Sequence, residues 1–414
     1  MSDILKMAEK AREASFKLSG ISLEIRNNAL QNIYNALLEN KEEILKKNQQ
    51  DIIQAEKDGL SPVMVKRLKV DEKVFAYMLK RFKDTIEIPD PLGIITKHMI
   101  NPQGMEVYRK SVPLGVIAMI YEARPNVSTD AVSVCIKSGN ALILRGGREA
   151  INTNVFLCDI MKKAAEDSGM PEGSLDIVRD TDHSTVTEML KLSDYIDVII
   201  PRGGKNLIKK ISEESRIPVI KHYDGICHQY VSFCNDYNMA TEIILNSKLQ
   251  KPEVCNALES LLIDTAVAEE YVPIICRALE DRGVKLLGCE KTRKIYPMEE
   301  ALEYDWSTEY LDYILSIKTV DGVRGAIDHI NKYSSHHTDG IITDDEAQTE
   351  LFLAETDSAN VLVNASTRLS GGGEYGMGSV VGISTDKLHA RGPVGPEELT
   401  SYKWIAKGKG HLRN

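Results

Sequence analysis

The sequence lacks long apolar runs and an excess of basic residues. No apolar stretch approaches the roughly 18 residues of a membrane-spanning helix, and the N-terminal segment "MSDILKMAEKAREASFKL" mixes charges among its apolar residues, unlike a signal-peptide core. The formal net charge is -10, whereas binding to nucleic-acid phosphates needs clustered positive charge. We therefore expect a cytoplasmic enzyme whose partners include no membrane and no nucleic acid.

The sequence also lacks several short motifs where they would be expected. Its seven cysteines form no C-x-x-C pair and no even disulfide spacing, so we expect reduced thiols. Its two glycine turns after predicted strands, in "LILRGGREA" and "VIIPRGGKNLI", have neither the G-x-x-x-x-G-K-[ST] spacing nor the G-x-G-x-x-G spacing. These absences exclude a Walker-type nucleotide site and the usual Rossmann fingerprint.

The composition is typical of a globular protein of two or three domains, with 414 residues, 43% hydrophobic and 27% charged. Residues 1 to about 88 have a helical character, and Ser61 before Pro62 predicts a helix start. Residues 96–112 contain two short extended runs around the turn sequence "NPQG", which favours a hairpin. The last segment, from Asp386 onward, is rich in glycine, proline and charge, and we expect it to wrap the protein or join a subunit contact.

After the hairpin, strand and helix patterns alternate. Continuous apolar runs are typical of strands that are buried on both faces of a sheet, and helical stretches such as 149–168 separate them. This pattern predicts a doubly wound parallel sheet, and a second alternation after residue 255 predicts a second α/β domain. The apolar runs lie at 114–121, 141–146, 175–179, 196–201 and 217–221, and then at 257–263, 284–288, 310–320, 340–343 and 359–366.

Glycines next to arginines follow two of these predicted strands, and each pair opens into a helix. The pairs are Gly146-Gly147 in "LILRGGREA" and Gly203-Gly204 in "VIIPRGGKNLI". Glycines there let backbone amides approach an anion at a helix N-terminus. A plain turn between strand and helix also favours glycine, and for either pair alone it is an equal alternative.

The two pairs together favour a dinucleotide site of unusual sequence. Arg145 and Arg148 flank the first glycine pair. Guanidinium groups match phosphate in geometry and charge, so these arginines could bracket a ribose 2'-phosphate. We therefore expect NADP as the cofactor in preference to NAD.

A cysteine lies on a loop in "KLQKPEVCNALESLLI", just ahead of a predicted strand. A cysteine seen alone is more often a small buried hydrophobe than a nucleophile. Cys255 therefore needs support from elsewhere in the chain before it is assigned to catalysis.

Four motifs supply that support. The stretch "PLGVIAMIYEARPNVSTDAVSVCIKSGNALILRGGREA", the loop "QKPEVCNALE", the late "VNASTRLSGGGEYGMG" and the tail "LHARGPVGPEELTSYKW" resemble the gamma-glutamyl phosphate reductase (glutamate-5-semialdehyde dehydrogenase) family, over nearly the whole chain. This family is a branch of the aldehyde dehydrogenase superfamily. The resemblance implies an NADP-binding domain at 1–95 and 113–231, a catalytic domain at 232–363, and an oligomerisation hairpin and tail at 96–112 and 364–414.

The resemblance also implies roles for individual residues. Cys255 would be the nucleophile, because a thiolate attacks an acyl carbon well and its thioester still accepts hydride. The Cys255 backbone N–H and Asn126 would stabilise the oxyanion, although Asn126 could instead cap a helix that begins near Ser128. Glu309 would bind the nicotinamide ribose, with a solvated surface glutamate as the alternative. Arg124 would position the phosphate that reacts at Cys255, with a role in a surface ion pair as the alternative.

One departure from the superfamily pattern indicates the reaction. Hydrolytic aldehyde dehydrogenases carry a glutamate base in a Glu-Leu-Gly-Gly stretch, and the matching region "KHYDGICHQYV" has no glutamate to activate water. Phosphate needs no such base. The resemblance thus implies NADPH-dependent reduction of L-glutamyl 5-phosphate to L-glutamate 5-semialdehyde, the second step toward proline.

The partners follow from the same resemblance. We expect a homo-oligomer, and we expect the acyl phosphate to come from a separate protein, with transient contact to glutamate 5-kinase as one possibility. A CoA-acylating aldehyde dehydrogenase would also lack the hydrolytic base and remains an alternative. A noncatalytic nucleotide-binding protein of the same fold is the other.

Two histidine clusters invite a metal assignment. The spacing of His222, Asp224, Cys227 and His228 matches no usual zinc signature, so we expect polar packing there. The pair His336-His337 precedes a predicted strand, and we expect a solvated turn. The sequence therefore predicts no metal.

Overall fold

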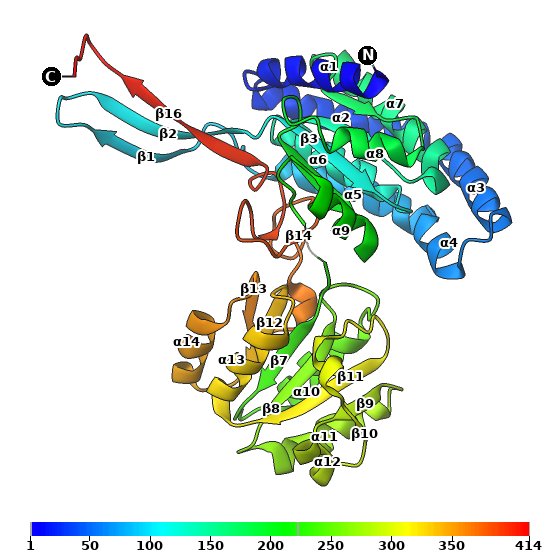
Figure 1. The fold of residues 1–414 in the computed structure, drawn as a ribbon, viewed down its shortest axis with the longest axis vertical. Coiled ribbons are helices and arrows are strands. Elements are labelled where there is room, and N and C mark those ends of the chain that lie inside the picture. Colours follow the sequence, from blue (N-terminus) through cyan, green and yellow to red (C-terminus); the bar gives the residue numbers. More distant parts are fainter. Residues whose placement is uncertain (1, 222, 414) are drawn as a thin grey trace. The chain divides into compact units, whose positions relative to one another are not determined.

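The computed structural model describes residues 2–221 and 223–413, and the chain divides into two compact units. Of the described residues, unit 1 comprises 2–221, 376–382 and 393–413, and unit 2 comprises 223–375 and 383–392 (Figure 1). The chain first passes between the units at residue 221 instead of the expected 231. Residues 364–375, which we grouped with the tail, belong to unit 2.

Five helices open unit 1, as the periodicity of this region predicts. Serine and aspartate side chains cap most of them, and Ser61 with Pro62 starts the fourth helix as expected. No helix among the described residues is long and apolar enough to cross a membrane. The helices are α1 (Asp3–Leu18), α2 (Leu23–Glu39), α3 (Lys41–Lys57), α4 (Pro62–Leu68) and α5 (Glu72–Glu87).

A parallel four-stranded sheet forms the centre of unit 1, in the order β5-β4-β3-β6. The two middle strands are fully buried, as their apolar runs predict. The predicted strand at 217–221 is wrong: only Val219 pairs there, in a single bridge with Ile199. The elements are β3 (Val116–Tyr121), α6 (Asn126–Lys137), β4 (Ala141–Arg145), η1 (Arg148–Ala150), α7 (Ile151–Asp167), β5 (Leu175–Ile177), α8 (His183–Met189), β6 (Val198–Arg202) and α9 (Lys205–Glu214).

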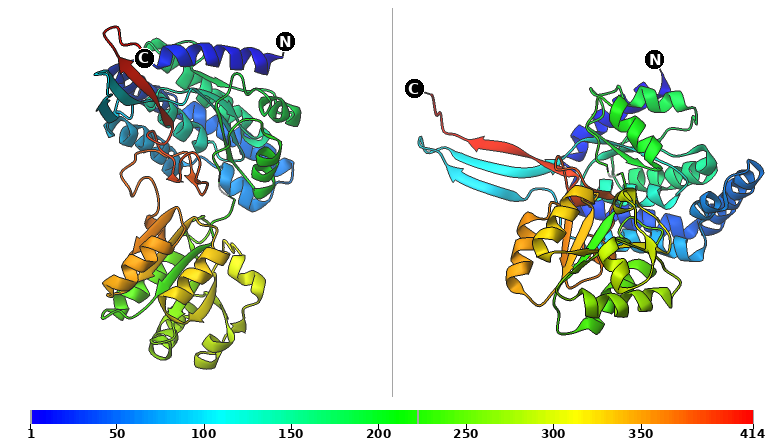
Figure 2. Two further views of the ribbon diagram at one scale, coloured as in Figure 1. Left: turned by 60° about the vertical axis from the view of Figure 1, so that its left-hand side comes forward. Right: turned by 60° about the horizontal axis from the view of Figure 1, so that its bottom comes forward.

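The predicted hairpin is present, and the tail of the chain joins it. Strands β1 (Ile95–Ile100) and β2 (Glu106–Pro113) pair antiparallel, and β16 (Thr400–Lys407) pairs antiparallel with the other edge of β2. Figures 1 and 2 show these three strands side by side as an extended arm of unit 1. All six residues of β1 are exposed. The sequence of the tail, with its little periodicity, did not reveal β16.

Unit 2 contains a seven-stranded parallel sheet in the order β10-β9-β11-β8-β7-β12-β13. Its alternation of strand and helix confirms the second predicted α/β domain. A short pair formed by β14 (Ile383–Ser384) and β15 (Gly392–Pro393) follows. The elements are β7 (Cys227–Val231), α10 (Tyr237–Leu249), β8 (Leu258–Asp264), α11 (Ala268–Glu280), β9 (Lys285–Gly288), α12 (Glu290–Ile295), β10 (Glu299–Glu300), η2 (Glu303–Ser307), β11 (Ile314–Val320), α13 (Gly322–Tyr333), β12 (Thr338–Ile342), α14 (Glu346–Glu355), β13 (Asn360–Val363) and η3 (Thr367–Leu369).

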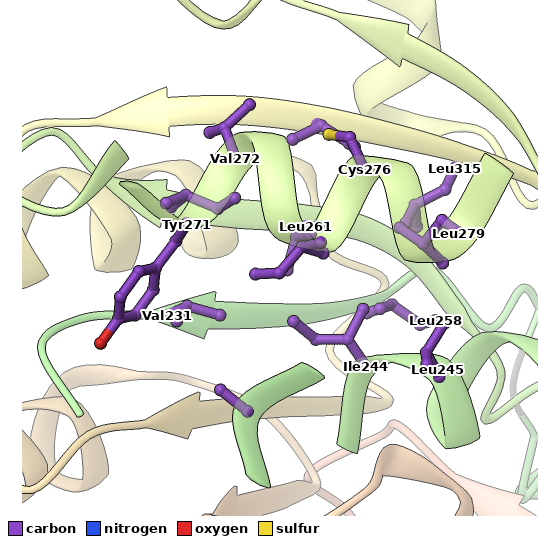
Figure 3. Close-up of a cluster of buried hydrophobic side chains, with 14 of the residues drawn as sticks. Val231, Ile244, Leu245, Leu258, Leu261, Tyr271, Val272, Cys276, Leu279 and Leu315 are labelled. Carbon is purple, nitrogen blue, oxygen red and sulfur yellow. The ribbon is translucent and has the colours of Figure 1, made fainter. Parts of the chain in front are cut away.

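Two apolar clusters cover the two faces of the sheet in unit 2. The larger one joins α10 and α11 to β7, β8 and β11, and Figure 3 shows its side chains. The smaller one joins α13 and α14 to the opposite face of the same strands. Because both faces are covered, strands such as β8 are buried along their whole length. This rigid sheet carries the loop that contains Cys255 at the start of β8.

Candidate active site

The loop between α10 and β8 presents Cys255, which is partly exposed. Burial raises the thiol pKa of five other cysteines, as we expect for structural residues: Cys135, Cys158, Cys227, Cys234 and Cys276. A thiol must lose its proton to act as a nucleophile. These five are therefore poor candidates for catalysis.

Cys289 is different from those five. It is partly exposed and precedes α12. Burial acts to raise the pKa of the Cys289 thiol. Hydrogen bonds from Thr292 and from backbone amides, including that of Thr319, act in the opposite direction, and the net effect is a lowered pKa. No sequence pattern indicated this environment, and any thiol-labelling experiment must separate Cys289 from Cys255.

The backbone of Gly225 lies directly against the Cys255 loop. A Cβ atom on Gly225 would be 2.5 Å from the Cys255 Cα and closer still to its carbonyl oxygen, so only glycine fits. The Cys227 thiol donates a hydrogen bond to the same carbonyl oxygen over 3.2 Å. The segment "DGIC" thus fixes the path of the nucleophile loop.

Glu309 is held beside this contact. Its Oε1 accepts a hydrogen bond from the Gly225 backbone N–H at 2.8 Å, and the residue is partly buried. The expected alternative of a solvated surface glutamate is therefore wrong. Gly225 thus contacts both the Cys255 backbone and the Glu309 carboxylate within unit 2.

The segment that replaces the hydrolytic base contains one carboxylate, Asp224. It is partly exposed and immediately precedes Gly225. The missing glutamate does not by itself exclude an aspartate as the base. Asp224 is therefore the residue to vary when water is tested as an acceptor.

A buried ion pair joins α10 and β8, the two elements that flank the nucleophile loop. Lys248, at the end of α10, contacts Glu259, near the start of β8, with an Nζ–Oε2 distance of 2.7 Å. The other oxygen of Glu259 accepts a hydrogen bond from the backbone N–H of Leu311. Leu311 is two residues from Glu309, so one connected set of contacts fixes both candidate residues of unit 2. No sequence pattern indicated this pair.

In unit 1, the two glycine pairs lie at the carboxyl ends of β4 and β6, on either side of β3. Strand order reverses here, which is the place where α/β sheets bind ligands. The Gly204 N–H, at the start of α9, donates to the Glu122 carboxylate at 2.8 Å. A Cβ atom on Gly203 would be 2.5 Å from the same carboxylate.

The first glycine pair has a similar environment. A Cβ atom on Gly147 would be 2.5 Å from the Glu149 carboxyl carbon, and one on Gly146 would clash with Asn154. The Glu149 carboxylate accepts from the Ala123 N–H at 2.5 Å. Both glycine turns thus face anionic oxygens already. The Gly204 amide thus binds an anionic oxygen of the protein itself, that of Glu122.

The two arginines beside the first glycine pair have different environments. Arg145 is only 6% exposed. Its guanidinium donates to three backbone carbonyls, those of Gly146, Thr181 and Asp182. Arg148, the first residue of η1, is exposed. Arg148 is therefore the better placed of the two for a ribose phosphate, and Arg145 anchors the loop that precedes α8.

Asn126 is the first residue of α6, so the expected alternative, an asparagine capping a helix that begins near Ser128, is wrong. Its Nδ2 donates to Asp130 over 3.2 Å, and the Ser379 hydroxyl donates to the other oxygen of Asp130. Burial raises the pKa of Asp130 to about 6, although the nearby Arg81 guanidinium acts to lower it. Asp130 thus orients the Asn126 amide within unit 1. Arg124, two residues earlier, is exposed.

The histidines take structural positions. His222 lies outside the described residues. His228 is buried, with Nδ1 3.2 Å from the Ile226 carbonyl oxygen, in agreement with polar packing. His337 is fully buried and contacts Thr338, so the expectation of a solvated turn is wrong for this residue. Across residues 2–221 and 223–413, no group of three or more potential ligands could hold a metal ion.

Comparison with known proteins agrees with these observations. The aldehyde dehydrogenase family model matches residues 1–312. The chain is 46% identical over 407 residues to gamma-glutamyl phosphate reductase of Caldanaerobacter subterraneus, with 98% of both sequences covered. It is also 46% identical over 412 residues to the enzyme of that name from Clostridium perfringens, with 99% of each covered. The chain belongs to the gamma-glutamyl phosphate reductase family.

Solved structures support this family assignment. The crystal structure of gamma-glutamyl phosphate reductase from Thermotoga maritima matches with a TM-score of 0.96 and 40% identity over 100% of both chains. An acetylating aldehyde dehydrogenase from Geobacillus thermoglucosidasius matches with a TM-score of 0.71 but only 17% identity, over 100% of this chain and 98% of that one, and so shares the fold. The chain is therefore an oxidoreductase with the aldehyde dehydrogenase fold, and membership of this family supports a nicotinamide cofactor.

Proposed function

We propose that this protein reduces L-glutamyl 5-phosphate to L-glutamate 5-semialdehyde with NADPH and releases phosphate, as the second step of proline biosynthesis in the cytoplasm. The family supports the reaction. The observation that carries the proposal is the environment of Cys255: a partly exposed thiol on a loop fixed by Gly225, beside Glu309.

Cys255 performs the first step in this proposal. Its thiolate attacks the acyl carbon, the C–O bond to phosphate breaks, and phosphate leaves with that electron pair. The resulting thioester then accepts a hydride, which bound NADPH would supply. The tetrahedral adduct collapses, the C–S bond breaks, and the aldehyde leaves as the Cys255 thiolate is restored.

Two donors stabilise the negative charge that develops on the carbonyl oxygen. The backbone N–H of Cys255 is one, and the side-chain amide of Asn126 is the other. The Asn126 amide is already oriented by Asp130. An oriented donor needs little reorganisation as charge develops, which is the condition for effective stabilisation.

The proposal assigns cofactor contacts to the residues that the sequence motifs and the family resemblance indicated. Gly146, Gly147, Gly203 and Gly204 provide backbone room for the phosphates, and Glu309 binds the nicotinamide ribose. Arg145 and Arg148 give the preference for NADP, with Arg148 in direct contact and Arg145 holding the loop in place. We assign Arg124 to the phosphate of the substrate.

The arm formed by β1, β2 and β16 is the proposed homo-oligomer contact. Its apolar side chains include Ile95, Met99, Ile100 and Trp404, all at least 45% exposed. Exposed apolar groups on strands are typical of a subunit interface. We also propose that the labile acyl phosphate arrives from glutamate 5-kinase through a transient contact.

The experiment that tests this function runs the reaction in reverse. Semialdehyde and NADP are supplied, and NADPH formation is followed at increasing phosphate or increasing CoA. Phosphate-dependent turnover supports the proposal. CoA-dependent turnover without phosphate would favour the CoA-acylating alternative, and failure to form NADPH with either acceptor would favour a noncatalytic protein.

A further inference from the structure

A turn from late in the chain is attached to both sides of the Cys255 loop. The Asn256 side-chain amide donates to the Arg368 carbonyl oxygen over 3.4 Å. The Arg368 Nε donates to the Gln250 side-chain oxygen at 2.9 Å. Gln250 and Asn256 flank Cys255 in the sequence, so these two bonds place Arg368 next to the nucleophile within unit 2.

Further bonds fix the same turn to α10. The backbone N–H of Thr367 donates to the Ser247 hydroxyl at 3.2 Å, and that hydroxyl also contacts Ser366. Ser247 is fully buried. These bonds to α10 therefore fix the position of η3 relative to the nucleophile loop. Arg368 lies within η3, so its backbone position is fixed as well.

The Arg368 guanidinium keeps donors for a ligand. Its hydrogen bond to Gln250 uses Nε. Neither of its two terminal nitrogens donates a hydrogen bond to any group in residues 2–221 and 223–413. The side chain is about half buried, and burial lowers its pKa. Among the neighbouring groups that act in the opposite direction, the Cys255 thiol is the strongest, followed by Cys227. A positive charge beside Cys255 favours an anionic substrate at this position.

The backbone that follows Arg368 is not closely packed at Gly371. The turn continues into the glycine run 371–373. A Cβ atom on Gly371 would have no heavy atom within 4 Å, in contrast to Gly225. The space beside the end of η3 is therefore open.

The substrate of the proposed reaction has one strongly anionic group at the reacting end. Its phosphate is attached through oxygen to the acyl carbon that Cys255 attacks, so it must lie within a few bond lengths of the sulfur. Two parallel N–H donors of an arginine match two phosphate oxygens. We infer that Arg368 binds the phosphate of the acyl phosphate beside Cys255 and stabilises it as it leaves. This inference rests on the proposed function.

Arg124 of unit 1 is the other arginine assigned to phosphate, and the two assignments are separable. Arg368 is hydrogen-bonded to Gln250 and Asn256, on either side of Cys255, and a cation at that position acts on the leaving group itself. If only Arg124 binds phosphate, removal of Arg368 leaves the phosphate dependence unchanged.

The first experiment measures the phosphate dependence of NADP reduction with semialdehyde. We expect Arg368→Ala to raise the KM for phosphate at least tenfold, Arg368→Lys to give an intermediate rise, and the KM for NADP to stay within twofold. Arg293→Ala is the matched control, because Arg293 is a partly buried arginine of the same unit that pairs with Glu300. Gln250→Ala, which removes the bond to Nε, should raise the phosphate KM less than Arg368→Ala.

A second experiment reports phosphate binding without turnover. Iodoacetamide labels Cys255, and mass spectrometry of the Cys255 peptide separates it from Cys289. Phosphate should slow the labelling of Cys255 in the unmodified protein, and this protection should be lost in Arg368→Ala and partly kept in Arg368→Lys. The labelling rate without phosphate shows separately whether Arg368 also favours the thiolate.

An unchanged phosphate KM and unchanged protection in Arg368→Ala would overturn the inference. If Arg368→Ala does not fold, Arg368→Lys decides by the same two readouts, and equality with the unmodified protein would overturn it. If the unmodified protein never shows phosphate-dependent NADP reduction, the proposed function fails instead. Protection of Cys255 by phosphate then still tests Arg368 alone.

Discussion

The backbone of Gly225 packs against the backbone of Cys255 so closely that a Cβ atom on the glycine would be 2.5 Å from the Cys255 Cα. The Gly225 N–H also holds Glu309. A single residue therefore couples the proposed nucleophile to the proposed ribose contact.

Gly225→Ala should displace the Cys255 loop. Overpacking of this kind costs about 1–3 kcal/mol of stability, and we expect a loss of kcat of at least a hundredfold, because the sulfur moves relative to the acyl carbon. Denaturant unfolding and steady-state kinetics measure both effects. Gly325→Ala is the control, since its Cβ atom would be in ordinary contact, 3.6 Å from Val320. Near-normal kcat in Gly225→Ala would contradict the account of this contact.

Cys255→Ala should remove turnover and leave NADPH affinity within about twofold, because no covalent intermediate can form. Equilibrium binding of NADPH and the turnover assay measure the two quantities. Cys135→Ala and Cys158→Ala serve as comparisons: both thiols are buried, so these changes should reduce stability and leave the site working. Appreciable turnover in Cys255→Ala would refute the assignment of the nucleophile.

Arg148→Ala should weaken NADPH more than NADH by about 1.5–3 kcal/mol, the size of a charge-assisted hydrogen bond. Arg145→Ala should instead lower the free energy of unfolding by about 1–3 kcal/mol, because buried backbone carbonyls lose their donor. Cofactor titration and denaturant unfolding of both variants separate these effects. Equal losses of NADPH and NADH affinity in Arg148→Ala would remove its role in cofactor choice.

Asp130 should make stability depend on pH. Burial raises the pKa of this carboxyl from 3.8 to about 6, so the folded state binds the proton more tightly than the unfolded state. The associated stabilisation is present below pH 4 and is lost as the pH rises through 6. A shift of this size corresponds to about 2–3 kcal/mol.

Denaturant unfolding from pH 4 to pH 7 tests this prediction against Asp130→Asn. Relative to that variant, the unmodified protein should lose about 2–3 kcal/mol of stability across the range. A difference between the two proteins that stays constant with pH would show that Asp130 titrates normally. A fall in kcat of Asp130→Asn at unchanged NADPH affinity would further support its role in orienting Asn126.

Much of the fold could be predicted because local patterns decide it. The apolar runs of β3 and β4 and the turn sequence of the hairpin predict these elements without knowledge of distant contacts. Strand β16 could not be predicted in this way, because it is stabilised by pairing with β2 far away in the sequence. The run at 217–221 is apolar but makes only one bridge, so hydrophobicity alone was not enough to predict a strand.

The site was less predictable for the same reason. Family motifs indicated Cys255 and Glu309 as candidates, but they did not show that Gly225 contacts both. Arg368 and Gln250 are 118 residues apart, and no local pattern marks their contact. A sequence also does not show whether an arginine side chain is exposed or bonded to the backbone. Arg148 is exposed, whereas Arg145 donates to backbone carbonyls.

The most direct test of the central claim is a rapid-mixing experiment with semialdehyde and NADP. Without phosphate, we expect a burst of about one NADPH per active site followed by a near stop, because the Cys255 thioester waits for an ionised acceptor. Addition of phosphate should start steady turnover. Steady NADPH formation in phosphate-free buffer, with free glutamate as product, would contradict the account, and its loss in Asp224→Asn would identify the group that activates water.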